Sequence, residues 1–328
     1  MMPLPWQQDL WHSLTAREAA GRLPHALLFY GARGMGKWQL AKAFASYLLC
    51  EARTSEGQPC GRCRGCTLFA AGTHPDFTVC APEEEGKSIT IDMIRELAAQ
   101  LAMTSQYGGY KVVLLNPADK MNTASANSLL KTLEEPTPRT ILILITAQID
   151  ALLPTIRSRC QKILFARPPR DITRSWLISQ HQVATQQADL LLNLADDAPL
   201  RALEYAQTEL LQQRADLLKV LDRLARGKTH PVAAVEESQA LSPEALLGWL
   251  TRWTMALIRY KFTEFQEDAE SPEVTKHLQQ YASALDLEHL YGFYDRLLAA
   301  GRLAKTQVNA QLLLEDVMTA WMRLHRQS

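Results

Sequence analysis

The sequence predicts an α/β domain with a mainly parallel sheet, followed by a small helical domain and a C-terminal all-α domain. Three observations predict this. Between residues 26 and 166, short apolar runs alternate with stretches of helical periodicity. The runs lack polar alternation, so we expect strands that are buried on both faces between helices. After RPPR (167–170) no segment is typical of a strand, and amphipathic helices fill the rest of the chain.

Five strands and three long helices are expected in the first domain. The strands are expected at residues 26–31, 77–82, 111–116, 140–146 and 162–166. The helices are expected at residues 37–50, 91–104 and 123–136. Asp92 suits the unpaired N–H groups at the start of the second helix. Pro136 ends the third, because proline removes a backbone donor.

The helical part of the chain divides into two predicted domains. ITRSWLISQH and ADLLLNLA suit a small helical domain. Longer amphipathic helices follow at 208–226, 242–262, 286–304 and 308–325. The predicted domains are therefore 1–166, 167–207 and 208–328.

Composition narrows the class of protein. The chain has 328 residues, of which 47% are hydrophobic and 21% charged, as in globular proteins. Basic and acidic residues both number 35, so any contact with nucleic acid must come from a local patch rather than from overall charge. The N-terminus has no signal-peptide pattern, and no apolar run approaches the roughly 20 residues that cross a bilayer. We expect a soluble, cytoplasmic protein with no membrane contact.

The stretch GARGMGKW lies between the first predicted strand and helix, which is the context of a phosphate-binding loop. Gly31, Gly34 and Gly36 let backbone N–H groups turn toward an anion, and Lys37 adds positive charge. Trp38 stands where a working NTPase supplies a hydroxyl to Mg²⁺. The loop therefore predicts an ATP site that works in some other way, an ATP-site scaffold without turnover, or a tight glycine turn with no ligand.

The second half of an ATP site is also altered. An apolar strand of an active site ends in Asp-Glu, which hold Mg²⁺ and orient the attacking water. Here Asn116 and Pro117 occupy those two places. Asp119 follows three residues after Asn116 and is interpreted as a helix-start carboxylate. Because the hydroxyl, the metal-holding carboxylate and the base are all missing, we do not expect hydrolysis at this site.

Four cysteines fall in one short loop with the spacing C-x9-C-x2-C-x2-C: Cys50, Cys60, Cys63 and Cys66. Four thiolates at this spacing suit a structural, tetrahedral Zn²⁺ with bonds of about 2.3 Å. A reactive dithiol or packed free cysteines are the alternatives.

Other residues bear on the cysteine loop. A Zn(Cys)4 centre carries negative charge, and we expect Arg53, Arg62 and Arg64 to offset it. Cys80 and Cys160 lie outside the loop and are expected to be ordinary buried thiols.

Arg159, between Ser158 and Cys160, directly precedes the last predicted strand. An arginine at the edge of an α/β domain can project into a neighbouring subunit's nucleotide site and act as an arginine finger. The segment alone also fits a simple surface ion pair.

Several of these segments occur in an order that resembles a known family. HALLFYG, the glycine loop, the four-cysteine loop, GTHPD, NSLLKTLEEP and the Ser-Arg-Cys triplet follow one another. The series resembles the clamp-loader subunits of bacterial DNA polymerase III, which are AAA+ proteins. The resemblance is strong over residues 20–166 and weaker through the helical C-terminus, where VNAQLLLEDVM is the most similar stretch.

The resemblance implies a particular role within that family. One kind of subunit is an ATP-hydrolysing motor, and another has lost the catalytic residues but keeps the cysteine loop and the Ser-Arg-Cys segment. Trp38, Asn116 and Pro117 place this chain with the second kind. The implied protein is not an enzyme on its own but a stator of the DNA polymerase III assembly. Its C-terminal domain would join a collar with the gamma/tau and delta subunits, and the assembly would load the sliding clamp onto primed DNA.

The resemblance also assigns roles to residues. Arg159 would complete the ATP site of the adjacent motor subunit. Thr146 matches the first sensor position, whereas Arg201 lies one residue from the second sensor pattern and is left unassigned. Because Lys37 is retained, weak nucleotide binding without turnover is a hypothesis.

Three rival functions remain open at this level. The first is an active P-loop ATPase, including a second motor subunit. The second is a zinc-containing DNA-binding module, and the third is a scaffold for another AAA+ machine.

Overall fold

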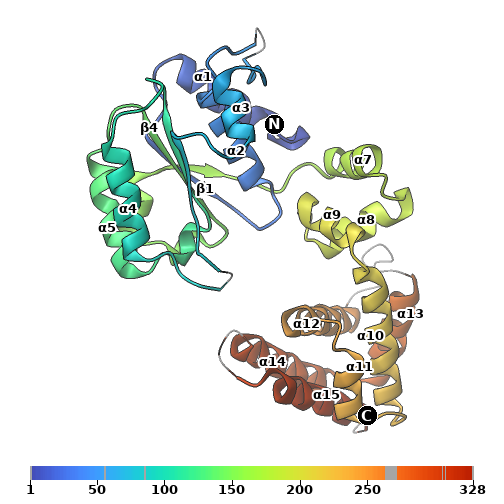
Figure 1. Ribbon diagram of the computed structural model, residues 1–328. Coiled ribbons are helices and arrows are strands. Elements are labelled where there is room, and N and C mark those ends of the chain that lie inside the picture. Colours follow the sequence, from blue (N-terminus) through green and yellow to red (C-terminus); the bar gives the residue numbers. More distant parts are fainter. Residues whose placement is uncertain are drawn as a thin grey trace. The chain divides into compact units, whose positions relative to one another are not determined.

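The computed structural model describes residues 2–54, 57–84, 86–262, 272–304, 306 and 308–326 (Figure 1). The chain forms two compact units. The first unit consists of Met1–Gln182 with Asp197–Arg201, and the second of Val183–Asp196 with Ala202–Ser328. The division into three domains at residues 166 and 207 stays a prediction.

A five-stranded parallel sheet forms the centre of the first unit, in the order β2-β3-β4-β1-β5. The strands are β1 (Ala26–Tyr30), β2 (Phe77–Cys80), β3 (Lys111–Leu115), β4 (Thr140–Thr146) and β5 (Gln161–Leu164). All five predicted strands and the parallel arrangement are therefore confirmed. The register pairs Tyr30 with both Thr146 and Leu164. The loop that follows β1 consequently starts beside the end of β4.

The three central strands and the two edge strands differ in burial. Every residue of β3 and β4 is buried, and so are the first four of β1. The edge strands β2 and β5 are more exposed, and Leu164 has 53% of its surface accessible. The expected burial on both faces thus holds only for the centre, because each edge strand has one neighbouring strand instead of two.

Helices cover both faces of this sheet (Figure 1). Ile94 of α4, Leu129 of α5 and Ile156 of α6 share one buried cluster with Leu28 and Val113 of the sheet. On the other face, α2 packs against β3 and β4. The helices of this unit are α1 (Gln8–Ala19), α2 (Lys37–Leu48), α3 (Arg64–Ala70), α4 (Ile91–Ala102), α5 (Thr123–Glu134), α6 (Pro154–Arg159) and α7 (Arg170–His181). Short 3-10 turns occur at η1 (Pro5–Gln7), η2 (Ala118–Lys120) and η3 (Ile149–Ala151).

Side-chain caps account for the first residues of α4 and α5. Thr90 accepts a hydrogen bond from the backbone N–H of Met93, and Asn122 accepts one from that of Ser125. Each satisfies an N–H group that has no partner inside the helix. Asp92 lies in the first turn of α4, as predicted.

The second unit is helical throughout its described residues. Its helices are α8 (Thr185–Leu194), α10 (Leu210–Ala225), α11 (Pro231–Glu237), α12 (Pro243–Tyr260), α13 (Pro272–Ala284), α14 (Leu287–Leu303) and α15 (Ala310–Arg326), while α9 (Pro199–Gln207) begins in the first unit. Trp253 and Trp321 lie in its core, and the indole N–H of Trp321 donates to the carbonyl oxygen of Leu221 at 3.1 Å. The four long helices predicted here are confirmed.

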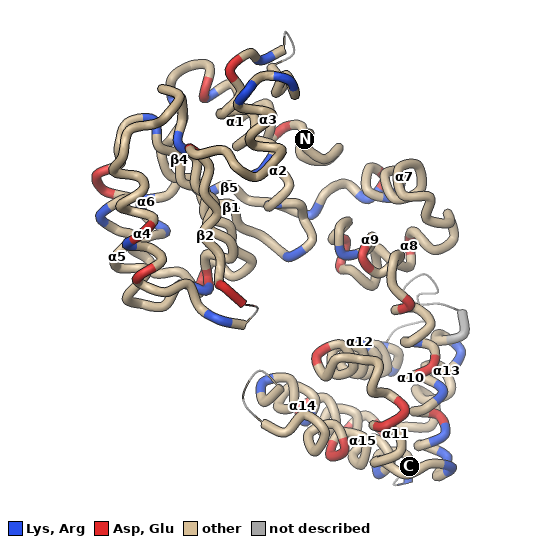
Figure 2. Tube along the Cα trace, viewed as in Figure 1, with Lys and Arg blue, Asp and Glu red and all other residues tan. Residues whose placement is uncertain are grey.

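Charged residues of both signs are interspersed along each unit (Figure 2), and the formal net charge of the whole chain is zero. Across the described ranges, every helix falls short of the length and apolarity needed to span a bilayer.

Candidate nucleotide-loop, arginine and four-cysteine sites

The loop between β1 and α2 has the backbone form of a phosphate-binding loop. Gly31, Gly34 and Gly36 have φ angles of 138°, 80° and 86°, in the region that only glycine enters readily. Gly36 is the N-cap residue directly before α2. The strand, the turn and the start of the helix therefore have the conformation that the sequence predicts.

Each of these glycines also makes room for another segment of the same unit. A Cβ atom on Gly31 would lie 2.5 Å from the carbonyl oxygen of Phe165, and one on Gly36 would lie 2.4 Å from Nε2 of Gln7. A Cβ atom on Gly34 would lie 3.0 Å from Cβ of Arg201. The loop is therefore enclosed by three segments that are distant in sequence.

Hydrogen bonds fix these segments to the loop. Gln7 Nε2 donates to the carbonyl oxygens of Met35 at 3.2 Å and Gly36 at 2.7 Å. The indole N–H of Trp6 donates to the same Met35 oxygen at 3.1 Å. The backbone N–H of Leu200 donates to the carbonyl oxygen of Gly34 at 3.1 Å.

Lys37 turns back onto its own loop. Its Nζ donates to the carbonyl oxygens of Gly31 and Ala32, each at 2.6 Å, and the residue is 8% exposed. Burial lowers the pKa of Lys37 to about 8, with Arg33 acting in the same direction and Asp119 against it. The ammonium group of Lys37 is thus already engaged by backbone oxygens of its own loop.

A cavity of about 320 Å³ opens beside this loop. The three residues that depart from an active ATP site, Trp38, Asn116 and Pro117, all line it, together with Asp119 and Thr146. The fold therefore brings together, around one cavity, residues of two separate sequence segments that both differ from the pattern of an active ATP site.

Asp119 has a second role that the sequence did not indicate. It lies in the first turn of η2, as interpreted from sequence, but it also lines the cavity and accepts a hydrogen bond from Thr146 Oγ1 at 2.5 Å. The backbone N–H of Gln148 donates to the same hydroxyl at 2.9 Å. Asp119 follows β3 and Thr146 ends β4, and the ends of neighbouring parallel strands lie at the same edge of a sheet. Pairing these two strands in the prediction would therefore have indicated this contact.

Arg159 ends α6, directly before the edge strand β5. Its Nη2 lies 2.5 Å from Oε1 of Glu134, and its side chain is 36% exposed. Its sequence neighbours are fixed, since Ser158 Oγ donates to the carbonyl oxygen of Thr155 at 3.0 Å and Cys160 is buried in the core. Arg157, on the same helix, pairs instead with Asp150 at 2.9 Å.

The four clustered cysteines converge in space. Their sulfur atoms all lie within 4.8 Å of one another, and Cys50 Sγ is 3.9 Å from Cys63 Sγ. A tetrahedron with Zn–S bonds of about 2.3 Å has sulfur separations of about 3.8 Å. The cluster could therefore hold a metal ion.

Backbone N–H groups point at these sulfurs. Those of Cys60, Cys63 and Cys66 donate to the sulfurs of Cys50, Cys60 and Cys63 at 3.3, 3.3 and 3.4 Å. The N–H groups of Arg62 and Cys63 lower the pKa of Cys60 to about 6. Donors of this kind favour the thiolate form that metal ligands adopt.

The cysteine loop is anchored to α1 and α2. Arg53 makes a two-pronged contact with Glu18, at 2.7 and 3.0 Å, and its guanidinium lies 3.9 Å from the ring centre of Tyr47. Arg53 was expected to offset the charge of the cysteines, but its contacts commit it to Glu18. A Cβ atom on Gly65 would lie 2.3 Å from the carbonyl oxygen of Leu49, so the loop returns tightly to the end of α2.

Comparison with known proteins identifies the family. Residues 6–169 match the family model described as "DNA polymerase III, delta subunit", and residues 208–323 match "DNA polymerase III, delta subunit, C terminal". The DNA polymerase III subunit delta' of Pseudomonas aeruginosa is 36% identical over 98% of this chain and 97% of its own length. The chain belongs to the DNA polymerase III delta' subunit family. The same subunit of Escherichia coli is 34% identical over 96% of this chain and 93% of its own length.

A solved structure supports the fold of this family member. A DNA polymerase III gamma subunit-related protein of Thermotoga maritima has a TM-score of 0.50 and 17% identity, covering 98% of this chain and 100% of its own. At that identity the likeness concerns the fold alone. It agrees with an AAA+-like α/β domain followed by helices.

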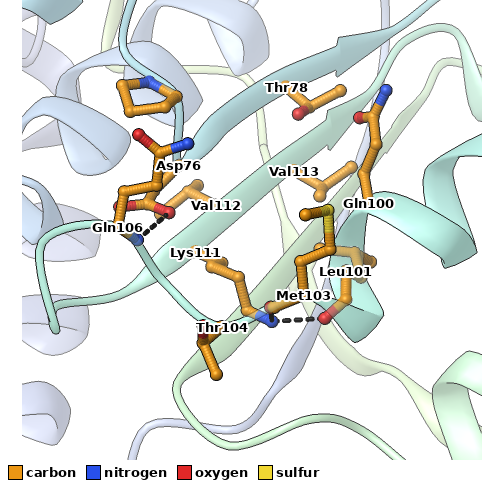
Figure 3. Close-up of a pocket in the computed structure, with 11 residues that line it drawn as sticks. Asp76, Thr78, Gln100, Leu101, Met103, Thr104, Gln106, Lys111, Val112 and Val113 are labelled. Carbon is orange, nitrogen blue, oxygen red and sulfur yellow. Dashed lines mark hydrogen bonds between the residues drawn. The ribbon is translucent and has the colours of Figure 1, made fainter.

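A larger cavity of about 460 Å³ lies elsewhere in the first unit, beside β2 and the end of α4 (Figure 3). The two buried charged residues that line it, Asp76 and Lys111, both make hydrogen bonds to other parts of the chain. Asp76 accepts from Ser105 Oγ and from the backbone N–H of Gln106, at 3.0 and 3.1 Å. Lys111 Nζ donates to the carbonyl oxygens of Leu101 and Met103. We therefore place no ligand there.

The remaining two cysteines are ordinary thiols, as predicted. Cys80 and Cys160 are 5% and 7% exposed, and burial raises the pKa of each to about 11. A raised pKa disfavours the reactive thiolate.

Proposed function

We propose that this chain is a cytoplasmic, non-hydrolysing stator subunit of the DNA polymerase III clamp loader. The observation that carries the proposal is the cavity lined by Trp38, Asn116 and Pro117. An indole replaces the hydroxyl that would bind Mg²⁺, and an amide and a proline ring replace the carboxylates that would hold the metal and orient water. The contacts of Lys37 with its own loop further reduce its attraction for phosphate.

The proposal gives the chain a catalytic contribution in trans. Arg159 lies at the edge of the α/β domain, on a short helix whose core side is fixed by Ile156 and Cys160. In the assembly its guanidinium would enter the ATP site of an adjacent gamma/tau motor subunit and stabilise the charge that develops on phosphate. The delta subunit, the sliding clamp and primed DNA would be its other partners within the assembly.

We further propose that the four cysteines hold one structural Zn²⁺. The sulfur separations fit four thiolate ligands, and backbone N–H groups donate to three of the four sulfurs. Because protein ligands would fill all four positions, the ion would stabilise the loop and would have no open site for chemistry.

ATP turnover tests the central proposal. It is measured for the isolated chain, for the chain reconstituted with gamma/tau, delta, clamp and primed DNA, and for the same assembly carrying Arg159→Ala. We expect the isolated chain to be inert. We expect Arg159→Ala to slow DNA-stimulated turnover at least several-fold, since a trans arginine contributes about 10³-fold or more at its own site.

Arg157→Ala is the matched control. Arg157 lies on the same helix and pairs with Asp150, so its loss should leave turnover unchanged. Assembly size is checked by gel filtration, because a broken complex would also lose activity. Turnover by the isolated chain would contradict the proposal and favour an active motor subunit.

The DNA-binding alternative has less support. Arg53, a basic residue of the cysteine loop, is paired with Glu18. Acidic and basic residues are interspersed in both units (Figure 2), whereas an extensive phosphate footprint requires a basic face.

A further inference from the structure

The guanidinium of Arg159 is held by a carboxylate of its own chain. Glu134 is the last residue of α5, and Arg159 is the last residue of α6. Nη2 of Arg159 lies 2.5 Å from Oε1 of Glu134. Nη1 donates to the carbonyl oxygen of Thr155 at 3.1 Å. One contact therefore comes from the arginine's own helix and the other from the neighbouring helix.

The packing below these helix ends fixes their separation. Leu129 and Leu133 of α5 share a buried cluster with Ile156 of α6 and with Cys160. Leu129 and Ile156 are completely buried. Because protein interiors are close-packed, the two helix ends keep a defined spacing. The contact between Glu134 and Arg159 is thus set by the fold rather than by chance on a mobile surface.

Stability alone does not explain this ion pair. The side chains of Arg159 and Glu134 are 36% and 50% exposed, and exposed ion pairs contribute little to folding. The pair does restrict a long side chain that would otherwise sample many rotamers. Its main physical consequence is therefore the orientation of the guanidinium.

The two contacts leave capacity for a further anion. Each terminal nitrogen of a guanidinium carries more than one N–H group, and the described contacts use one acceptor for each nitrogen. The remaining donors can bind phosphate oxygens while Glu134 and Thr155 still hold the side chain. A side chain fixed in advance loses less entropy when it binds.

We propose that Glu134 is the positioning residue for Arg159, and this inference rests on the trans role proposed above. Glu134 orients the guanidinium before the neighbouring nucleotide arrives and keeps that orientation while phosphate charge develops. It touches no substrate itself and acts through Arg159.

Steady-state ATP turnover of the reconstituted assembly tests this role. We expect Glu134→Ala to lower kcat about tenfold, because a misplaced group loses transition-state contact, and to leave KM for ATP nearly unchanged. Glu134→Gln keeps an acceptor oxygen at nearly the same position and should lose less. Glu135→Gln changes the adjacent exposed residue and should change nothing.

A double-mutant cycle separates positioning from a general structural effect. If Glu134 acts through Arg159, then Glu134→Ala has no further effect in the Arg159→Ala background. A further loss in that background would overturn the inference, as would unchanged or faster turnover with Glu134→Ala alone. If Arg159→Ala itself has no effect, the proposed trans role fails first, and the positioning role fails with it.

A measurement on the isolated chain checks the contact directly. In ¹⁵N NMR of the arginine side chains, we expect slow rotation of the Arg159 guanidinium that becomes fast with Glu134→Ala and stays slow with Glu135→Gln. Fast rotation in the unmodified chain would contradict the proposal, whatever the turnover result.

Discussion

Lys111 places an ammonium group at the C-terminal end of α4, where the last carbonyl groups have no partner within the helix. Its Nζ donates to the carbonyl oxygen of Leu101, to that of Met103 at 2.8 Å and to Thr137 Oγ1 at 3.1 Å. Burial lowers the pKa of Lys111, and Asp76 opposes this shift. The lysine therefore serves the fold, since its donors are used by the chain.

We predict that Lys111→Met lowers the free energy of unfolding of the first unit by about 2–4 kcal/mol. The methionine fills similar space but leaves buried carbonyl groups without a donor. Urea unfolding of the two proteins measures the difference. Lys162→Met, on the exposed edge strand β5, should stay within about 0.5 kcal/mol of the unmodified chain. A loss of that small size for Lys111→Met would refute the prediction.

Single residues were predictable where a motif gives each position a chemical role. Trp38, Asn116 and Pro117 could be recognised because the ATP-site pattern states which atom belongs at each place. Glu134 could not be recognised, because its partner lies 25 positions away and no local spacing links two exposed charges of different helices. The commitment of Arg53 to Glu18 was missed for the same reason.

Among the elements, α1, α2 and the cysteine loop are joined through one carboxylate, that of Glu18. Glu18 of α1 accepts from Arg53 of the loop and from the hydroxyl of Tyr47 of α2, the latter at 3.0 Å. Burial by itself would raise the pKa of Glu18, but the hydrogen bonds from Arg53 and Tyr47 outweigh it, and the pKa is lowered. The contact thus depends on an ionised Glu18.

The lowered pKa of Glu18 predicts a pH dependence of stability. The stabilisation is complete above the unfolded-state pKa and is lost as pH falls through the folded-state value. We expect Glu18→Gln to destabilise the first unit by about 1–3 kcal/mol at pH 7. The difference from the unmodified chain should shrink as pH falls below about 4.5.

Thermal unfolding at a series of pH values measures that difference. Subtracting the value for the unmodified chain at each pH removes the pH dependence that the two proteins share. Glu96→Gln, at an exposed position of α4, is the matched control. A constant difference across the pH range would show that the ionisation of Glu18 does not contribute.

Regular elements were predictable when their apolar pattern was long. All five strands lie where periodicity places them, to within a few residues, and so do the longer predicted helices α2, α4, α5, α10, α12, α14 and α15. The sequence did not indicate α1, in which only Trp11 and Leu14 are buried. It also did not indicate α3, which begins in the cysteine loop, or α13. Pro231 begins α11, because proline suits the first turn of a helix.

For the whole molecule, the cysteine cluster belongs to one of the two compact units. The loop starts at the end of α2 and is anchored to α1, both in the first unit. A metal bound to the folded cluster would therefore stabilise that unit, since the unfolded chain lacks the assembled site.

We predict one Zn²⁺ per chain, and its removal should loosen only the first unit. Metal analysis measures the content, and hydrogen exchange before and after chelation locates the effect. Amides of α2 and β1 should exchange faster, whereas those of α12 and α15 should not change. Cys63→Ser should abolish the metal, and Cys80→Ala should retain it. Metal retained by Cys63→Ser would contradict the four-cysteine site.

The division of the chain into compact units was the feature that the sequence predicted least well. The parallel sheet and the helical remainder follow from local patterns, and family membership is shown by similarity along nearly the entire chain. The division between compact units depends on contacts between distant helices, for which no local pattern exists. The first unit accordingly includes Asp197–Arg201, which the sequence places among the later helices.

The close approaches at Gly31, Gly34 and Gly36 have an evolutionary consequence. A lineage that no longer uses ATP at this loop still cannot replace these glycines cheaply, because Phe165, Arg201 and Gln7 lie against them. Selection for packing alone can preserve the signature of a nucleotide site after the chemistry has gone. Cavity-facing positions such as Trp38 and Asn116 instead line the site itself. If the proposed function holds, residues at those positions would indicate the loss of ATP use more directly than the glycines do.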